Sequence, residues 1–110
     1  MSVYVVQERK KYNSVTGDME PVVNLAPACE FGDLIQLFDH RQHALLVGPT
    51  TSHLKNKLRN FNDDDYILPI GNPILIAASI AIAAKNNHGK VKLLNWDREL
   101  GRYIVLNYEL

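Results

Sequence analysis

The chain has little cysteine and no net charge, and each shortage excludes a class of protein. A single cysteine, Cys29, among 110 residues leaves no intrachain disulfide and too few thiols for a multi-cysteine zinc site. Lysine plus arginine comes to 12 and aspartate plus glutamate to 12, so the formal charge is zero. A neutral chain is a poor candidate for a polybasic membrane binder or a DNA coat protein.

The sequence also lacks an apolar run long enough to cross a membrane. Its longest run, residues 74–84, is interrupted only by Ser79, and it falls well short of the roughly 20 residues that a spanning helix needs. No basic segment followed by an apolar stretch marks a secretory signal at the start. The remaining composition, 46% hydrophobic and 22% charged, predicts one soluble domain over residues 1–110, located in the cytoplasm.

Several short segments predict strands because they are rich in β-branched and aromatic residues. We expect strands at 3–7 and 22–25, on either side of a turn at 13–18. Residues 33–38 and 44–47 read as an antiparallel hairpin around the polar stretch 39–43. Residues 90–96 and 102–110 predict a second hairpin, with Gly101 left-handed beside its turn. One face of the last strand is the better core candidate: Ile104, Leu106, Tyr108 and Leu110.

Two helices are expected between these hairpins, separated at 66–68 by a short strand or an extended connector. The first follows a break at Gly48 and Pro49, and Thr50 or Thr51 is its expected N-cap. Its apolar residues recur at helical spacing in one stripe: Leu54, Leu58 and Phe61.

The second helix begins at Pro73, with Asn72 as N-cap, and stops at Gly89, for which a positive φ is expected. It is apolar on all sides, so it should be buried on most of them, with Ile76 and Ile80 in the core. The expected class is α+β: a mostly antiparallel sheet with one amphipathic and one fully apolar helix. The alternation of strands and helices is too brief to favour a doubly wound parallel sheet.

Three stretches combine turn and core residues in a distinctive way: PVVNLAPACEFGDL at 21–34, DDYILPIGNP at 64–73, and GKVKLLNWD at 89–97, followed by Arg102 and Tyr103. They are similar to a family of small proteins from contractile-tailed bacteriophages that infect marine cyanobacteria (cyanophages). The resemblance covers residues 20–110. It implies a protein made in the cytoplasm of an infected cell, accessory to host takeover or virion production, and it carries over no catalytic residues.

Two strand-to-helix junctions share a glycine, a proline and a polar residue. They place Gly48, Thr50 and Thr51 at one helix start, and Gly71 and Asn72 at the other. Free amides at a helix start bind anions, so the two junctions could together hold a nucleotide phosphate or a carboxylate. The ordinary alternative is a plain connection between strand and helix. Neither junction has a phosphate-loop lysine or the three-glycine dinucleotide pattern.

A basic strand offers a nucleic-acid interface as a second candidate. Lys90, Lys92 and Trp96 share one strand face, Arg98 and Arg102 lie near its turn, and residues 9–11 add a further basic run. Nucleic-acid binders combine such charges with stacking rings. The competing interpretation is a solvated sheet face whose lysines prevent edge pairing.

No catalytic set, cofactor or metal site is predicted. His40 and His43 have a ligand-like spacing, but they fall in a loop without a second cluster, so we expect solvated side chains. The aspartates at 63–65 read as a helix stop rather than a cation site. Cys29 is more readily a small buried hydrophobe than a nucleophile.

An enzyme is therefore the less favoured class. The favoured function is a non-catalytic phage accessory protein that acts as a protein-binding or regulatory module on a host or phage protein. The alternatives are a nucleic-acid-binding accessory protein and a nucleotide or anion binder. A homodimer is possible through either the apolar helix or the last strand, with Ala81 and Leu106 as the positions that distinguish the two routes.

Overall fold

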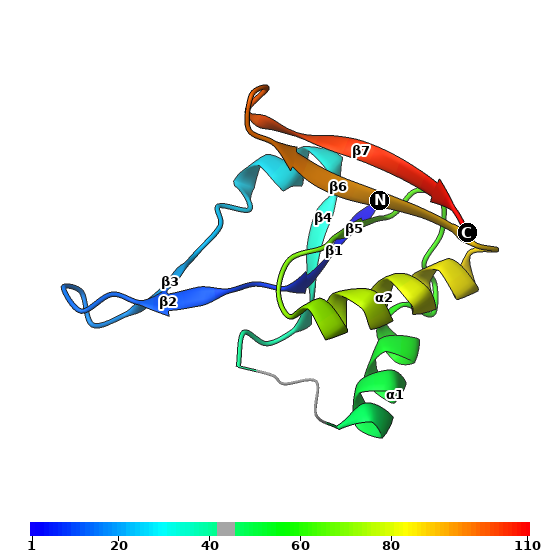
Figure 1. Cartoon of the computed structure of the whole chain (residues 1–110), viewed down its shortest axis with the longest axis horizontal. Helices are drawn as coiled ribbons and strands as arrows, with labels where there is room; N and C mark the ends of the chain where they lie inside the picture. The colour runs from blue at the N-terminus through cyan, green and yellow to red at the C-terminus, as the bar shows by residue number, and fades with distance from the viewer. Residues whose placement is uncertain (42–45) are drawn as a thin grey trace.

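The computed structural model of the chain describes residues 1–41 and 46–110, and its centre is a five-stranded sheet (Figure 1). The strands lie in the order β4-β1-β5-β6-β7. β1 pairs in parallel with β4 and β5, and β5 pairs in parallel with β6, whereas β7 runs antiparallel to β6. Their bounds are Ser2–Gln7 (β1), Asp33–Phe38 (β4), Tyr66–Leu68 (β5), Lys90–Asp97 (β6) and Arg102–Glu109 (β7).

The chain contains both helices and strands, as the predicted α+β class requires, but the prediction of a mostly antiparallel sheet is wrong. After β1 the chain adds β4 on one side, then returns and adds β5, β6 and β7 on the other. That order is the order of a doubly wound sheet, which the sequence disfavoured. The alternation of strands and helices is hidden because β5 has three residues and because no α-helix separates β1 from β4.

The predicted hairpin of residues 33–38 and 44–47 is also wrong. β4 pairs in parallel with β1, and Val47 already belongs to helix α1 (Val47–Lys57). Residues 44 and 45 lie outside the described residues, as does His43. Neither Thr50 nor Thr51 is the N-cap, because Leu46 holds that position and the Thr51 hydroxyl donates to the Val47 carbonyl.

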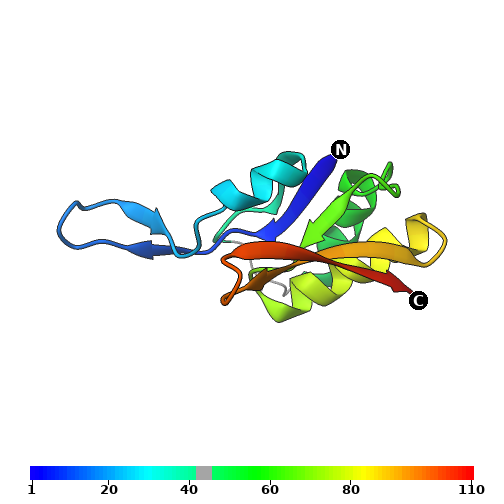
Figure 2. The same ribbon diagram turned by 90° about the horizontal axis from the view of Figure 1, so that it is seen from above.

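The connection between β1 and β4 forms a projecting hairpin and one short helix. Strands β2 (Lys10–Tyr12) and β3 (Met19–Pro21) pair antiparallel around the predicted turn. We call residues 10–21 the arm, because it extends well beyond the sheet in both views (Figures 1 and 2). The predicted strand at 22–25 is irregular instead, with a bend at 22–23, and a 3-10 helix, η1 (Ala26–Phe31), follows it. Cys29 lies in η1 and is exposed, so its predicted burial is wrong.

The sheet has two unlike faces. On the helix face, α1 and α2 (Pro73–Asn86) pack over Tyr4 and Val6 of β1. The three residues of the predicted stripe, Leu54, Leu58 and Phe61, are buried there. Only Leu54 lies within α1, however, because the helix ends at Lys57, Leu58 is its C-cap and Phe61 follows it. On the other face, which we call the η1 face, Val3 and Val5 pack with Ala28 of η1. The η1 face is thus covered by a single 3-10 helix in the described part of the chain.

Helix α2 begins as predicted but is buried on one side only. The Asn72 side chain accepts from the Ile74 amide at 2.8 Å, and Gly89 takes a φ of 83°. Its buried residues are Leu75, Ser79, Ala83 and Ala84. Ile76 and Ile80 are half-buried, and the opposite stripe is exposed at Ile74, Ala77 and Ala81. The described residues therefore do not supply the cover that an all-round apolar helix was expected to have.

The buried residue of the last strand lies on the face opposite to the predicted core face. Tyr103, on the η1 face, is only 5% exposed, whereas Ile104 and Leu106 on the helix face are half-buried. Tyr108 is 47% exposed and Leu110 74%. The reason is position, because β7 is the edge strand and lies beyond β6, the strand that α2 contacts.

None of the described helices is long and apolar enough to cross a membrane.

Candidate functional site

The crevice where ligands bind in doubly wound sheets is filled by the chain itself. It lies at the carboxyl ends of β1 and β5, where the strand order reverses. Gln7, 5% exposed at the end of β1, accepts from the Asn72 amide and donates to the Asp39 carbonyl, both at 3.0 Å. Arg9 donates to the Gly71 carbonyl at 3.0 Å. These bonds tie β1 to the start of α2 and to the end of β4.

The close approach of Gln7 also explains the glycine at position 71. Its φ is 114°, and a Cβ there would lie 2.5 Å from the Gln7 Cβ. The predicted anion-site residues Gly71 and Asn72 thus border a closed crevice, and the Asn72 and Ile74 amides already have acceptors. The other predicted residues, Gly48, Thr50 and Thr51, lie in the first turns of α1, directly after the part of the chain that is not described.

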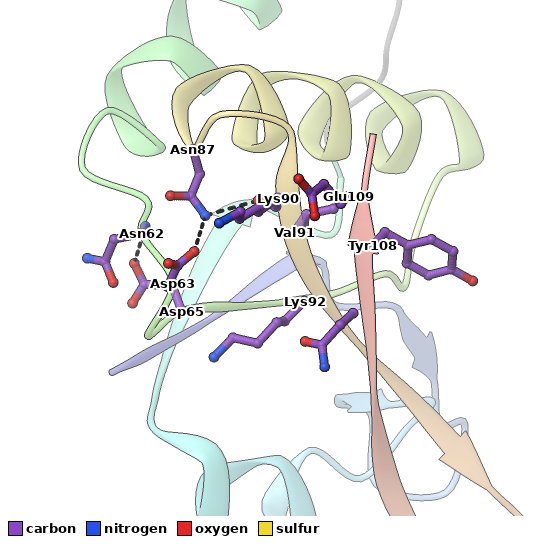
Figure 3. A pocket seen from close by; sticks show the side chains of 10 residues that line it. Asn62, Asp63, Asp65, Asn87, Lys90, Val91, Lys92, Tyr108 and Glu109 are labelled. Carbon is purple, nitrogen blue, oxygen red and sulfur yellow. Dashed lines mark hydrogen bonds between the residues drawn. The ribbon is translucent and has the colours of Figure 1, made fainter.

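A polar pocket lies at the opposite end of the sheet, between the loop before β5 and the strands β6 and β7 (Figure 3). Asp65, 5% exposed, accepts from the Ser2 amide at 3.0 Å and the Asn62 amide at 3.1 Å. The Asn87 amide group donates to Asp63 at 2.8 Å and to the Lys90 carbonyl at 3.0 Å. The hydrogen bonds of Asp65 and Asn87 hold loops in place, so they serve the fold.

Two of the predicted nucleic-acid residues line this pocket beside acidic groups. The Lys92 ammonium lies 4.3 Å from the centre of the Tyr66 ring, and Lys90 borders the same pocket. The pocket also holds three carboxylates: Asp63, Asp65 and Glu109. The charge around the two lysines is therefore mixed rather than basic.

The remaining basic-strand residues lie elsewhere. Trp96 and Arg98 line a groove at the far end of β6, where the Trp96 and Tyr103 rings meet edge to face at 5.0 Å. Arg102 pairs in register with Asp97, a position that belongs to the helix face. The structure thus brings Trp96 and Arg98 together and separates them from Lys90, Lys92 and Arg102.

The aromatic groove on the η1 face was not predicted as a unit. It runs from Trp96 and Tyr103 to Ile70 after β5 and Val23 at the base of the arm. Burial raises the pKa of Tyr103 above its ordinary value, so this phenol stays neutral at physiological pH. The alternation of strand residues signals Trp96 and Tyr103, but no local pattern signals Val23.

A second cleft lies at the carboxyl ends of β1 and β4, beside α1. His53 of α1 lies in it, with its Nε2 2.5 Å from the Leu37 carbonyl and its ring 5.1 Å from that of Phe38. Hydrogen bonds from the Arg41 backbone and guanidinium hold the pKa of Asp39 below its usual value. In residues 1–41 and 46–110, no three histidine, cysteine or acidic side chains gather as a metal-ligand set.

The arm exposes its apolar side. Tyr12 and Met19 are directly opposite each other in the ladder, so they share one side, and they are 65% and 47% exposed. Lys10 and Pro21 lie on the same side at the base of the arm, whereas Lys11 and Glu20 share the other side. The turn is well bonded, since Asn13 accepts from the Gly17 amide at 2.8 Å and donates to Glu20 at 2.8 Å. The sequence predicts the turn but not the two strands that it joins.

These features define a small α+β protein in which the crevice at the carboxyl ends of β1 and β5 is closed. Its exposed apolar and aromatic groups lie on the arm and in the groove of the η1 face. A family model described as Phage Pam3 gp32-like protein matches residues 1–110, and the chain belongs to this family of phage proteins. No curated protein and no solved structure matches the chain. The phage origin implied by the resemblance is thereby confirmed, although the match does not extend to the type of tail or the host.

Proposed function

We propose that this phage protein is a non-catalytic accessory protein that binds another protein through the apolar side of the arm. The observation that carries the proposal is the exposure of Tyr12 and Met19 on a hairpin that projects from the sheet (Figure 2). The partner is a host or phage protein with a complementary apolar groove.

Physical chemistry favours a partner on this surface. A two-stranded hairpin is at best marginally stable alone, and within the described part of the chain β2 and β3 pack chiefly against each other. Covering Tyr12 and Met19 would stabilise the hairpin and remove apolar area from water. Tyrosine and methionine are enriched at protein interfaces, and methionine adapts to irregular surfaces.

The setting of this function follows from the sequence resemblance. It supports a contractile-tailed phage that infects cyanobacteria, with the protein acting as one domain in the cytoplasm of the infected cell. The partner would then be part of host takeover or of virion production.

A matched pair of arm variants tests the proposal. The double variant Tyr12→Asp and Met19→Asp places charges on the apolar side, while Lys11→Ala and Glu20→Ala change the opposite side. Tagged proteins are used to capture partners from infected cells, followed by a binding assay with the purified partner. We expect binding to be lost only in the first variant. Equal binding by both variants, with circular dichroism showing both folded, would remove the arm from the interface.

Nucleic-acid binding is the second candidate, and the exposed Trp96 beside Arg98 favours it. The contact would join base stacking on Trp96 to phosphate pairing by Arg98. Binding of a single-stranded oligonucleotide that weakens with salt and disappears in Trp96→Ala would support this function in place of the arm. The carboxylates around Lys90 and Lys92 make it the less favoured of the two.

A further inference from the structure

The outer edge of β7 has no partner strand in the described chain. β7 is the last strand in the sheet order. The Leu110 amide donates inward to the Gly89 carbonyl at 2.6 Å, and the pairing of β6 with β7 continues without a bulge. Backbone groups alternate in direction along an antiparallel strand. The amides and carbonyls of four residues therefore point outward: Tyr103, Val105, Asn107 and Glu109.

Among the described residues, little protects the middle of this edge against pairing. β7 is eight residues long, and its charged residues, Arg102 and Glu109, stand only at its two ends. The opposite edge, β4, is shorter and has Asp33 and the exposed Gln36. Long apolar edges free of charge pair with other strands unless something covers them.

We propose that a second copy of this chain pairs with this edge, β7 against β7, in a two-fold dimer with a continuous sheet. An axis perpendicular to the sheet makes the two strands antiparallel and keeps each face continuous with the same face of the second copy. Paired residues must then come from the same face, so their numbers have the same parity.

One register uses every outward backbone group. With Leu106 opposite Leu106 of the second copy, Tyr103 pairs with Glu109 and Val105 pairs with Asn107. All four outward residues of each chain then exchange hydrogen bonds.

The same register completes the half-buried helix face. Ile104 comes opposite Tyr108 of the second copy, beside the central pair of Leu106 residues. These are non-hydrogen-bonded pairs, in which side chains approach most closely. An unrelated extended peptide could add to the edge, but this chain supplies a strand of equal length whose apolar residues are complementary to themselves.

Asn107 gives a clean test because its side chain is exposed and its amide points outward. Asn107→Pro removes two intermolecular donors in each dimer without touching the bonds to β6, and Asn107→Ala is the matched control. Light scattering should give the wild type about twice the 12.5 kDa mass of the chain at high micromolar concentration. We expect Asn107→Pro to weaken the dimer roughly ten- to hundredfold and Asn107→Ala to leave it intact.

Disulfide trapping tests the register independently. After Cys29→Ser removes the native thiol, Leu106→Cys should form a disulfide-linked dimer, because such a pair has its Cα atoms about 4.5 Å apart, within the roughly 4.4–6.8 Å that a disulfide spans. Leu100→Cys, in the exposed turn before β7, should not.

Three results would overturn the proposal. The first is a wild-type mass of 12.5 kDa at every concentration, which would leave the edge free for a peptide from another protein. The second is a dimer unaffected by Asn107→Pro, which would move the interface to the exposed stripe of α2. The third is trapping through Val105→Cys in place of Leu106→Cys, which would overturn the register. None of these results bears on the arm.

Discussion

Gln7 should stabilise the fold far more than its single side chain suggests, because it joins three elements. Replacing Gln7 with alanine removes the acceptor of the Asn72 amide and the donor to the Asp39 carbonyl, both at 3.0 Å. Each lost hydrogen bond costs about 1 kcal/mol, and the buried methylene adds about 0.8 kcal/mol. The free energy of unfolding should therefore fall by about 3 kcal/mol.

The matched control is another glutamine with a side-chain hydrogen bond. Gln36 donates to Glu8 at 3.0 Å, but it is exposed, so Gln36→Ala should change the free energy of unfolding by less than about 0.5 kcal/mol. Urea unfolding followed by circular dichroism measures both. If the two variants have the same midpoint, the Gln7 contacts do not hold β1, β4 and α2 together, and the reasoning about the closed crevice fails.

Four further substitutions, at three positions, test α2. Leu75→Ala should lower the free energy of unfolding by about 3–5 kcal/mol, because Leu75 is fully buried. Ile76→Ala should lower it clearly less, because Ile76 is half-buried. Equal losses in urea unfolding would contradict the one-sided burial of the helix. Asn72→Ala should lower the free energy of unfolding by about 1 kcal/mol and Asn72→Gly by only a few tenths, as measured by thermal unfolding, and a glycine variant as unstable as the alanine variant would show that the side chain does more than cap.

The sequence predicted most elements of the fold but not how the strands pair. The helix from Pro73 with its Asn72 cap, the strand at 66–68 and the C-terminal hairpin were all found from local patterns. Parallel pairing has no such local signal, because β1 meets β4 and β5 only after long connections. An antiparallel hairpin is the pairing that adjacent short strands suggest, so the strand at 33–38 was predicted correctly but its partner was not.

At the start of α1, Gly48 and Pro49 correctly indicated that a helix begins nearby, but the boundary predicted from them was wrong. Gly48 and Pro49 suggested a break before the helix, yet both lie in its first turn. The amides of that turn have no partner within the helix, so proline is tolerated there. Leu46 makes no side-chain cap bond, and nothing in the composition of the segment marked the true boundary.

The candidate surfaces were less predictable than the fold because each combines distant segments. The Gln7 contacts span more than sixty residues to Asn72, and the aromatic groove adds Val23 to the far end of β6. Periodicity predicts which side of a strand a residue occupies. It does not predict that Gln7, at the end of β1, will bond to the start of α2 and close the crevice between β1 and β5.

The place where the arm joins the sheet has a mechanical consequence. The arm leaves directly from the end of β1, and β1 has a parallel neighbour on each side. A partner pulling on the arm along the strand direction would load both ladders in shear, so their hydrogen bonds would have to break together rather than one after another. Gln7 and Arg9, bonded to the start of α2 at the base of the arm, would take up that force first. The arm is therefore anchored to transmit tension into the body of the protein without unzipping it.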